Sequence, residues 1–337
     1  MKTSMKLAIA ALAIIVIGVA LSMAGYENKG SNLFNIRFNI GNNTTDSKLI
    51  TKSEKLNSFT DIDIDTDIDN IEIVSSDQYR IELAYDEAEG DINYYNDNGT
   101  LTIKPADKLT ILDINFNANY QSSSLKIYVP QDAKINSAKI DVDDGNINIS
   151  GIDLAKASID NSYGSVILSS LVMEEAIINA DDGNIELKDI TAKEVTLDNS
   201  YGNVTIDSLV ADNLECDMND GNFNGSNITI NNKTYLDNDY GNVEFAGLST
   251  DSLEADLEDG NIKINELKCN SSKIDNEYGD IELNYLGDEN EFNYSLDSEY
   301  GTVTVGGIEQ GDKANKESGE KSISAQCENG NINITFN

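Results

Sequence analysis

The sequence of 337 residues contains no histidine and no tryptophan, and it has only two prolines and three cysteines. Without histidine the chain lacks the most common general base and the most common zinc ligand. Positive charge is also scarce, because 60 acidic and 23 basic side chains give a formal net charge of −37. Such a chain would be repelled by a phosphate backbone, so we do not expect it to bind nucleic acid. These shortages also disfavour most enzyme chemistry.

The rest of the composition is that of a folded protein rather than of a disordered acidic tail. Hydrophobic residues make up 39% of the chain, and 15 of its residues are tyrosine. A chain this apolar can bury a core, so the excess negative charge is expected on its surface.

An apolar run extends from Leu7 to Gly25, behind two lysines. Its length suffices to cross a bilayer, although the small residues at Ser22 and Ala24 also suit a signal peptidase. Residues 1–25 are therefore predicted to be a signal anchor or a cleaved signal peptide, and the length favours the anchor. By the positive-inside rule, both interpretations place the following residues outside the cytoplasm. We expect a single-pass membrane protein anchored through residues 7–25, or a secreted protein if the run is cleaved.

Glycines recur at a nearly fixed interval in the later part of the chain. They lie at Gly145, Gly164, Gly183, Gly202, Gly221, Gly241, Gly260, Gly279, Gly301 and Gly330. The first four intervals are 19 residues, and the later ones are 20, 19, 19, 22 and 29. The positions two and four after each glycine, and five before it, are almost wholly apolar, and the residue directly after it is mostly asparagine. Apolar positions spaced by two are typical of β-strands.

One repeat is too short to bury its own apolar positions, so successive repeats must stack. We therefore predict an all-β fold, a single-chain β-solenoid (β-helix-like) with coils of about 19 residues behind an N-terminal apolar helix. At the usual spacing between strands of about 4.8 Å, the stacked asparagines would hydrogen-bond to their copies in adjacent coils. The handedness stays open, and so does the choice between a coil of 19 residues and a flattened coil of 38 residues.

Four segments follow from this pattern. Residues 1–25 are the anchor or signal peptide, 26–55 a stalk or linker, 56–130 an irregular β cap with the first coils, and 131–337 the β-solenoid of 19-residue repeats.

The segment LKIYVP, followed by DDGNINI, SYGSVIL, DDGNIEL and SYGNVTI units behind an apolar span, resembles a known family. This is the bacterial putative-adhesin β-strand-repeat family of the toast-rack superfamily, and the resemblance covers roughly residues 56–337. It implies a cell-surface β-helix-like domain, labelled an adhesin by analogy, whose relatives are associated with membrane-stress signalling. The family supplies no catalytic residues.

The residue before each glycine alternates between aspartate and tyrosine, and the residue three before alternates between an apolar side chain and asparagine. The tyrosines include Tyr163, Tyr201, Tyr240 and Tyr278. Because asparagine accompanies tyrosine, the favoured interpretation is that the tyrosine ring fills the core where the apolar side chain is missing. The alternative is a row of exposed tyrosines that binds a sugar or a protein.

Four residues before the glycines stands a nearly continuous acidic column. Its members are Asp141, Asp160, Asp198, Asp217, Asp237, Asp256 and Asp275. Carboxylates about 5 Å apart repel each other by roughly 1 kcal/mol even in water. One hypothesis is that Ca²⁺ binds along this column, because Ca²⁺ prefers hard oxygen ligands. The favoured interpretation is an acidic face that is merely solvated, since no EF-hand or calcium β-roll motif is present. No other metal or cofactor is predicted.

The three cysteines, Cys216, Cys269 and Cys327, stand in apolar columns and are predicted to be small buried hydrophobic residues rather than disulfide partners. The chain ends directly after a predicted strand at 332–336, with no evident cap on that edge of the stack.

Together these features predict a non-enzymatic extracytoplasmic surface module that presents a repetitive acidic face to a cell-envelope protein or to an external surface. The family resemblance also implies a role in cell-envelope stress sensing. One alternative is a self-associating structural rod, which the uncapped edge would favour. The other is a β-helix enzyme that cleaves acidic polysaccharides with paired aspartates. The enzyme is disfavoured, because no arginine follows Arg80 and the acidic surface would repel such a substrate.

Overall fold

The computed structural model describes residues 35–39, 48–86, 91–106, 110–115 and 122–337. These residues fall into two units. In the smaller unit, β1 (Asn35–Asn39) pairs in parallel with β8 (Thr110–Asn115). The apolar run at 7–25 lies outside the described residues, so the anchor stays a prediction. Among the residues that are described, no helix has the length and apolarity needed to cross a membrane.

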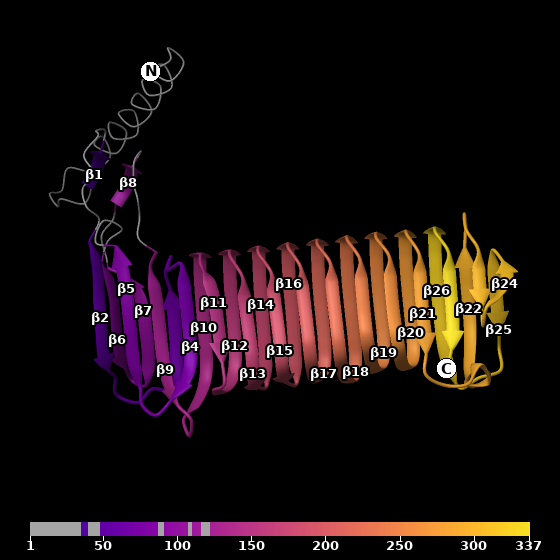
Figure 1. Cartoon of the computed structure of the whole chain (residues 1–337), viewed down its shortest axis with the longest axis horizontal. Coiled ribbons are helices and arrows are strands. Elements are labelled where there is room, and N and C mark those ends of the chain that lie inside the picture. Colours follow the sequence, from indigo (N-terminus) through magenta and orange to yellow (C-terminus); the bar gives the residue numbers. More distant parts are fainter. Residues whose placement is uncertain (1–34, 40–47, 87–90, 107–109, 116–121) are drawn as a thin grey trace, which may run out of the picture. The chain divides into compact units, whose positions relative to one another are not determined.

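The larger unit is a stack of two-walled coils (Figure 1). In the middle of the stack, one wall precedes each glycine and the other follows it. The preceding strands are β10 (Lys134–Asp144), β12 (Asp153–Tyr163), β14 (Glu175–Asp182) and β16 (Glu194–Tyr201). The following strands are β11 (Asn146–Ser150), β13 (Val166–Val172) and β15 (Ile185–Thr191). Later strands run from one glycine to the next: β17 (Val204–Asp220), β18 (Phe223–Tyr240), β19 (Val243–Asp259) and β20 (Ile262–Tyr278).

The pairing register settles the length of a coil. Ile140 of β10 pairs in parallel with Ile159 of β12, and Ile147 of β11 pairs with Val166 of β13. Each strand therefore lies beside the strand one repeat later, and 19 residues make one complete coil. The fold class predicted from the sequence is confirmed for the described residues as an all-β, solenoid-like stack.

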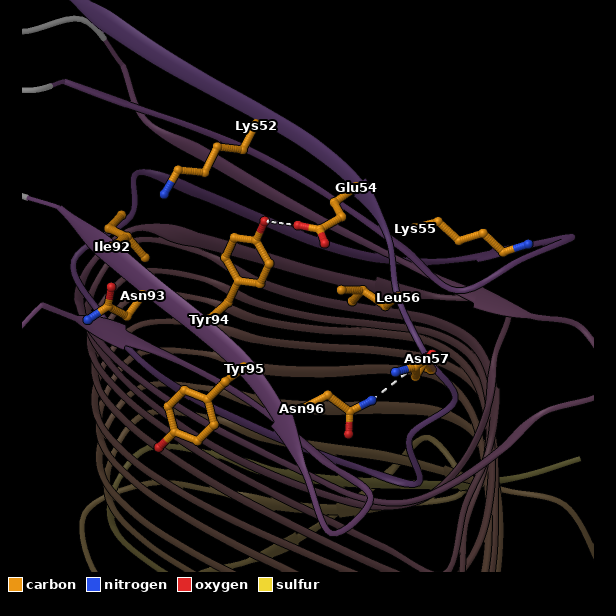
Figure 2. Close-up of a pocket in the computed structure, with 10 residues that line it drawn as sticks. All are labelled: Lys52, Glu54, Lys55, Leu56, Asn57, Ile92, Asn93, Tyr94, Tyr95 and Asn96. Atoms are coloured by element: carbon orange, nitrogen blue, oxygen red, sulfur yellow. Dashed lines mark hydrogen bonds between the residues drawn. The ribbon is translucent and has the colours of Figure 1, made fainter.

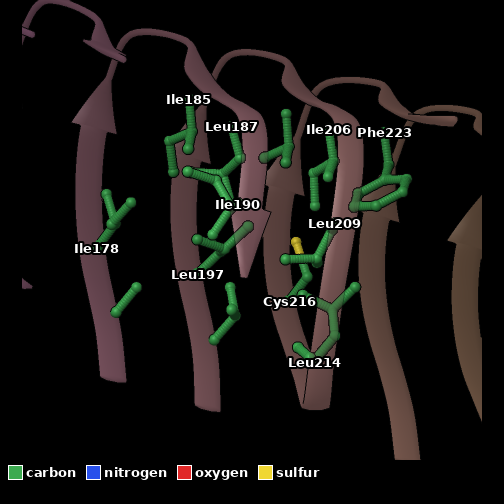
Figure 3. Packing of buried hydrophobic residues seen from close by; sticks show 14 of the residues in the cluster. Ile178, Ile185, Leu187, Ile190, Leu197, Ile206, Leu209, Leu214, Cys216 and Phe223 are labelled. Atoms are coloured by element: carbon green, nitrogen blue, oxygen red, sulfur yellow. The ribbon is translucent and has the colours of Figure 1, made fainter. Parts of the chain in front are cut away.

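The core is a continuous aliphatic column between the two walls. Figure 3 shows Ile178, Leu197 and Cys216 at equivalent places on successive strands, and all three are fully buried. Side chains alternate between inside and outside along each strand, so every second residue faces this core. All three cysteines are buried and unpaired, as predicted.

The walls also meet at a second corner, opposite the glycines. The residue six after the glycine has a positive φ in seven coils, and it is Gly151, Ser170, Asp189, Ser208, Asn227, Gly247 or Glu266. This left-handed backbone lets the chain turn from one wall to the other within a few residues.

At the N-terminal end of the stack, spatial order departs from chain order. β3 (Asp61–Asp65) and β4 (Asn70–Ser76) pair with β10 and β11. The later strands β7 (Thr100–Pro105) and β9 (Ser124–Pro130) pair with the outer sides of β3 and β4. Three antiparallel strands complete this end: β5 (Arg80–Asp86), β2 (Leu49–Lys55) and β6 (Ile92–Asp97). β2 lies within the segment that we expected to be a linker.

The C-terminal end shows the same inversion. β26 (Lys321–Asn329) pairs with β20, and β27 (Ile332–Phe336) pairs with β21 (Ile281–Tyr285). The segment that comes directly after β21 in the chain lies further out. That segment forms η1 (Glu289–Glu291), β22 (Phe292–Ser298) and β23 (Val303–Val305), and its two strands lie beyond β26 and β27. The short antiparallel strands β24 (Ile308–Gly311) and β25 (Lys313–Lys316) pair with β23 and β22. The expected uncapped edge at 332–336 is therefore wrong, because the last strand is enclosed between two others.

Candidate functional site

The most regular surface of the molecule is the edge where the walls meet at the glycines. We call it the glycine corner, and it comprises residues 141–146, 160–165, 179–184, 198–203, 217–222, 237–242, 256–261 and 275–280. Successive glycines pack against each other here. A Cβ atom on Gly221, for example, would lie 2.6 Å from the carbonyl carbon of Gly202 and would overlap its oxygen. Gly221 also has φ +148°, which side chains strongly disfavour. Glycine is thus required for both space and backbone conformation.

The core beneath the glycine corner contains buried asparagines, and this overturns the favoured interpretation of the tyrosines. Asn161, Asn199, Asn238 and Asn276 are each at most 1% exposed. The side-chain amide of Asn161 donates hydrogen bonds to the carbonyl oxygens of Gly145 (3.1 Å) and Gly164 (2.9 Å). Asn276 likewise donates to Gly260 (3.0 Å) and Gly279 (3.1 Å). Asn161 and Asn276 thus each serve the glycine carbonyls of two coils, while Asn199 and Asn238 each donate to one, Gly183 and Gly221 (both 3.3 Å). The coils between them carry an apolar residue in this slot.

The tyrosines lie on the outside, contrary to the prediction that their rings fill the core. Tyr163, Tyr201, Tyr240 and Tyr278 are 58%, 60%, 53% and 49% exposed. The cross-strand register pairs each of them with an exposed aspartate in the adjacent coil, as in Tyr163 with Asp182 and Tyr201 with Asp220. The two residue types thus alternate along the glycine corner, and tyrosine recurs in every second coil. The alternative interpretation, an exposed aromatic row, is the one that the structure shows.

The asparagines that follow the glycines form the expected ladder beside this row. The side-chain oxygen of Asn203 accepts hydrogen bonds from the backbone N–H of Asn222 (3.0 Å) and from its side-chain amide (3.2 Å). Asn222 accepts the same two bonds from Asn242, and Asn242 accepts them from Asn261. Each of these asparagines is hydrogen-bonded to the asparagine of the adjacent coil, and the bonds stabilise the edge that carries the tyrosines.

The aspartates predicted to bind Ca²⁺ are also brought into one column. Asp198 pairs with Asp217, Asp217 with Asp237 and Asp237 with Asp256, while Asn179 interrupts the column between Asp160 and Asp198. Among the described residues, no three acidic or cysteine side chains converge in a way that would hold one metal ion. The calcium assignment stays a prediction.

Electrostatic strain in this column affects its protonation. Partial burial, and then repulsion by Asp237 and Asp198, raises the pKa of Asp217 above its ordinary value. Burial, followed by repulsion from the carboxylates of adjacent coils, raises the pKa of Asp141 and Asp256 in the same direction. The native state therefore holds these charges at a cost in stability.

The basic residues of the stack lie away from the glycine corner, whose eight segments contain no lysine or arginine. Lysines elsewhere pair with glutamates of adjacent coils, as in Lys193 with Glu174 (3.1 Å) and Lys156 with Glu175 (2.9 Å). The edge that exposes the tyrosines is thus uniformly acidic.

A shallow hollow of about 660 Å³ lies at the N-terminal end of the stack, between β2 and β6 (Figure 2). The hydroxyl of Tyr94 donates a hydrogen bond to Glu54 at 2.6 Å, and this bond raises the pKa of Tyr94 to about 12. The Lys52 ammonium lies 5.8 Å from the centre of the same ring. Tyr94, Glu54 and Lys52 thus interact with one another in the lining of the hollow.

Fold and surface together define a class: a β-repeat protein built from stacked two-walled coils, in which the glycine corner repeats from coil to coil. Comparison with family models gives a match to toastrack DUF4097 over residues 59–245 and 177–335. The chain belongs to this family, as its sequence motifs indicated.

Comparison with solved structures gives matches of low sequence identity. One is a "putative lipid binding protein" from Parabacteroides distasonis, 14% identical, with a TM-score of 0.47; the alignment covers 86% of this chain and 97% of that one. Another is a "putative adhesin" from Parabacteroides merdae, 16% identical, with a TM-score of 0.45 and the same coverages. A third, a "putative adhesin" from Bacteroides fragilis, is 16% identical with a TM-score of 0.34, covering 85% of this chain and 97% of that one. The search of curated proteins found no match.

Proposed function

We propose that this chain is a non-enzymatic, adhesin-like module of the cell surface that presents the glycine corner to a protein or to an external surface. The observation that carries the proposal is the row of exposed tyrosines in every second coil. The buried asparagines complete the core beneath them, so packing does not account for aromatic rings at these positions. Exposed aromatic side chains on a rigid edge are typical of contact surfaces.

An extracytoplasmic location is part of the proposal. The apolar run at 7–25 behind two lysines favours export. A repeated edge also suits multivalent contact, in which several weak sites act together. Within this function, adhesion and envelope-stress sensing differ in the partner that binds.

Cross-linking in intact native cells tests the function. A photo-reactive residue replaces Asp198 at the glycine corner of the full-length chain, and a matched control carries it at Thr205, which is exposed on the other wall. We expect the Asp198 position to capture partners that the Thr205 position does not. One membrane sensor or transporter would indicate envelope signalling, and matrix material or a foreign surface would indicate adhesion.

Two outcomes would contradict the proposal. Equal capture at both positions would show that the glycine corner is not the contact surface. Capture of only other copies of the chain would favour the self-associating rod, although its original support, an uncapped last strand, is absent from the structure.

A further inference from the structure

The glycine corner carries a row of aromatic and acidic side chains with no partners of their own. We call it the tyrosine–aspartate row, and it consists of Asp144, Tyr163, Asp182, Tyr201, Asp220, Tyr240, Asp259 and Tyr278. All eight side chains are exposed. Within the described residues, no ion pair reaches the four aspartates, and no ring contact or cation occupies the four tyrosines.

The negative charge of the tyrosine–aspartate row favours a positively charged partner. Tyr163, Tyr201 and Tyr240 each pair with an aspartate in both adjacent coils, so a cation over one of these rings would have a carboxylate within reach on either side. Tyr278, at the end of the row, pairs with Asp259 on one side and with Asn329 on the other. Lysine and arginine are absent from the eight segments of the glycine corner, so none of its own side chains supplies that cation. Arginine suits such a site, because its planar guanidinium stacks on an aromatic face and also pairs with carboxylates.

The spacing between successive tyrosines of the row favours a partner in the polyproline II conformation. Tyrosines recur in every second coil, which at about 4.8 Å per strand places them about 9.6 Å apart. A polyproline II helix advances about 3.1 Å per residue with three residues per turn, so it presents the same face about every 9.3 Å. The mismatch over four tyrosines is only about 1 Å, well within the reach of a long basic side chain.

We propose that the tyrosine–aspartate row binds an extended basic polypeptide segment with arginine or lysine at every third residue. Each cation lies over one tyrosine ring beside the aspartates of the adjacent coils, and the segment runs along the stack. This proposal rests on the proposed function, since it names the contact surface and the chemistry of its partner.

A pair of peptides of equal charge tests the spacing. The probes are a peptide of five Arg-Pro-Pro units and one of five Arg-Pro-Pro-Pro units, titrated by calorimetry against the purified full-length chain in mild detergent. We expect the three-residue repeat to bind at least about tenfold more tightly, because the four-residue repeat cannot align its cations with successive tyrosines. Binding should also weaken as salt is raised.

Variants of the chain test the rings. Tyr201→Ala should weaken binding about 2–5-fold, the range expected for one exposed cation–π contact. Replacement of all four tyrosines of the row should weaken it on the order of 100-fold. Asp182→Asn and Asp220→Asn should weaken it as well and reduce its salt dependence. The control is Tyr95→Ala, since Tyr95 is 49% exposed but lies at the N-terminal end of the stack outside the row. Unchanged thermal unfolding would confirm that the variants remain folded.

Three results would overturn the inference. Equal affinity for the two peptides would reveal only diffuse attraction to a chain of charge −37. Unchanged binding by the four-tyrosine variant would have the same meaning. Binding of a neutral oligosaccharide through the same tyrosines, with no peptide binding, would identify a sugar surface instead. Cross-linking at Asp198 separates this failure from failure of the proposed function, because partners can be captured there even when both peptides fail.

Discussion

Replacement of Gly221 by alanine should disrupt the stack at one defined place. The added Cβ would overlap the Gly202 carbonyl, 2.6 Å from its carbon, so the two coils would have to separate there. Separation would strain the flanking backbone hydrogen bonds from Gly202 to Asp220 (2.9 Å) and from Gly221 to Tyr240 (2.8 Å). Alanine at φ +148° costs about 1–3 kcal/mol in backbone strain. Overpacking adds about 1–3 kcal/mol, which gives a total of about 2–6 kcal/mol.

The matched control isolates the steric part of this loss. Gly307 also has a positive φ, +78°, but a Cβ there would meet no atom within 4 Å, so Gly307→Ala should cost only about 1–2 kcal/mol. Urea unfolding followed by far-UV circular dichroism compares the two variants. Amide hydrogen exchange then locates the damage, since coils of a repeat protein can open locally. If Gly221→Ala were no more destabilising than Gly307→Ala, the argument from close glycine packing would be refuted.

Four other predictions concern a buried asparagine, the aspartate column, an ion pair between adjacent coils and the binding of Ca²⁺. Asn199→Ala should destabilise the fold by about 1–3 kcal/mol, because the Gly183 carbonyl loses its hydrogen bond inside the core; an unchanged urea midpoint would contradict this role. Because the pKa of Asp217 is raised in the folded state, its ionised carboxylate destabilises the fold at any pH above that folded-state pKa. This destabilisation disappears below 3.8, the pKa of the carboxyl group in the unfolded chain. Asp217→Asn should therefore raise the melting temperature at pH 7 but not at pH 3. A hydrogen bond from Lys233 lowers the pKa of Glu254, so Glu254→Gln should lower the melting temperature at pH 7. This loss should disappear as the pH falls through the folded-state pKa of Glu254. Melting curves at pH 7 and pH 3 check the opposite signs expected for the Asp217 and Glu254 variants. If the aspartate column binds Ca²⁺, millimolar Ca²⁺ added after chelation should raise the melting temperature, and an unchanged value would leave only a solvated acidic face.

Much of the repeat could be predicted because each coil obeys the same local rules. Alternation by two identifies inward and outward residues, so the buried apolar columns, the buried cysteines and the asparagine ladder all followed from the spacing of the glycines. The family resemblance rested on the same motifs, and the match over residues 59–245 and 177–335 confirms it.

The prediction that the tyrosines fill the core is wrong because it takes polarity as the guide to burial. By that guide, Asn161 is unsuited to the core and the ring of Tyr163 fills its place. In the structure the asparagine is buried because two glycine carbonyls need its amide protons, and the ring lies outside. The signal was available in the alternation itself, since an amide with two donors can serve two coils and is needed only in every second one.

The sequence by itself determined the period, the strand walls and the residues that face the core, because these depend on side-chain alternation within each coil. Only the tertiary structure decided which coil lies beside which. β26 and β27 insert between strands that precede them in the chain, and β3 and β4 are covered by the later strands β7 and β9. Coils with matching apolar columns can pair in more than one order, and the order is selected by how the connecting segments and antiparallel strands close the two ends.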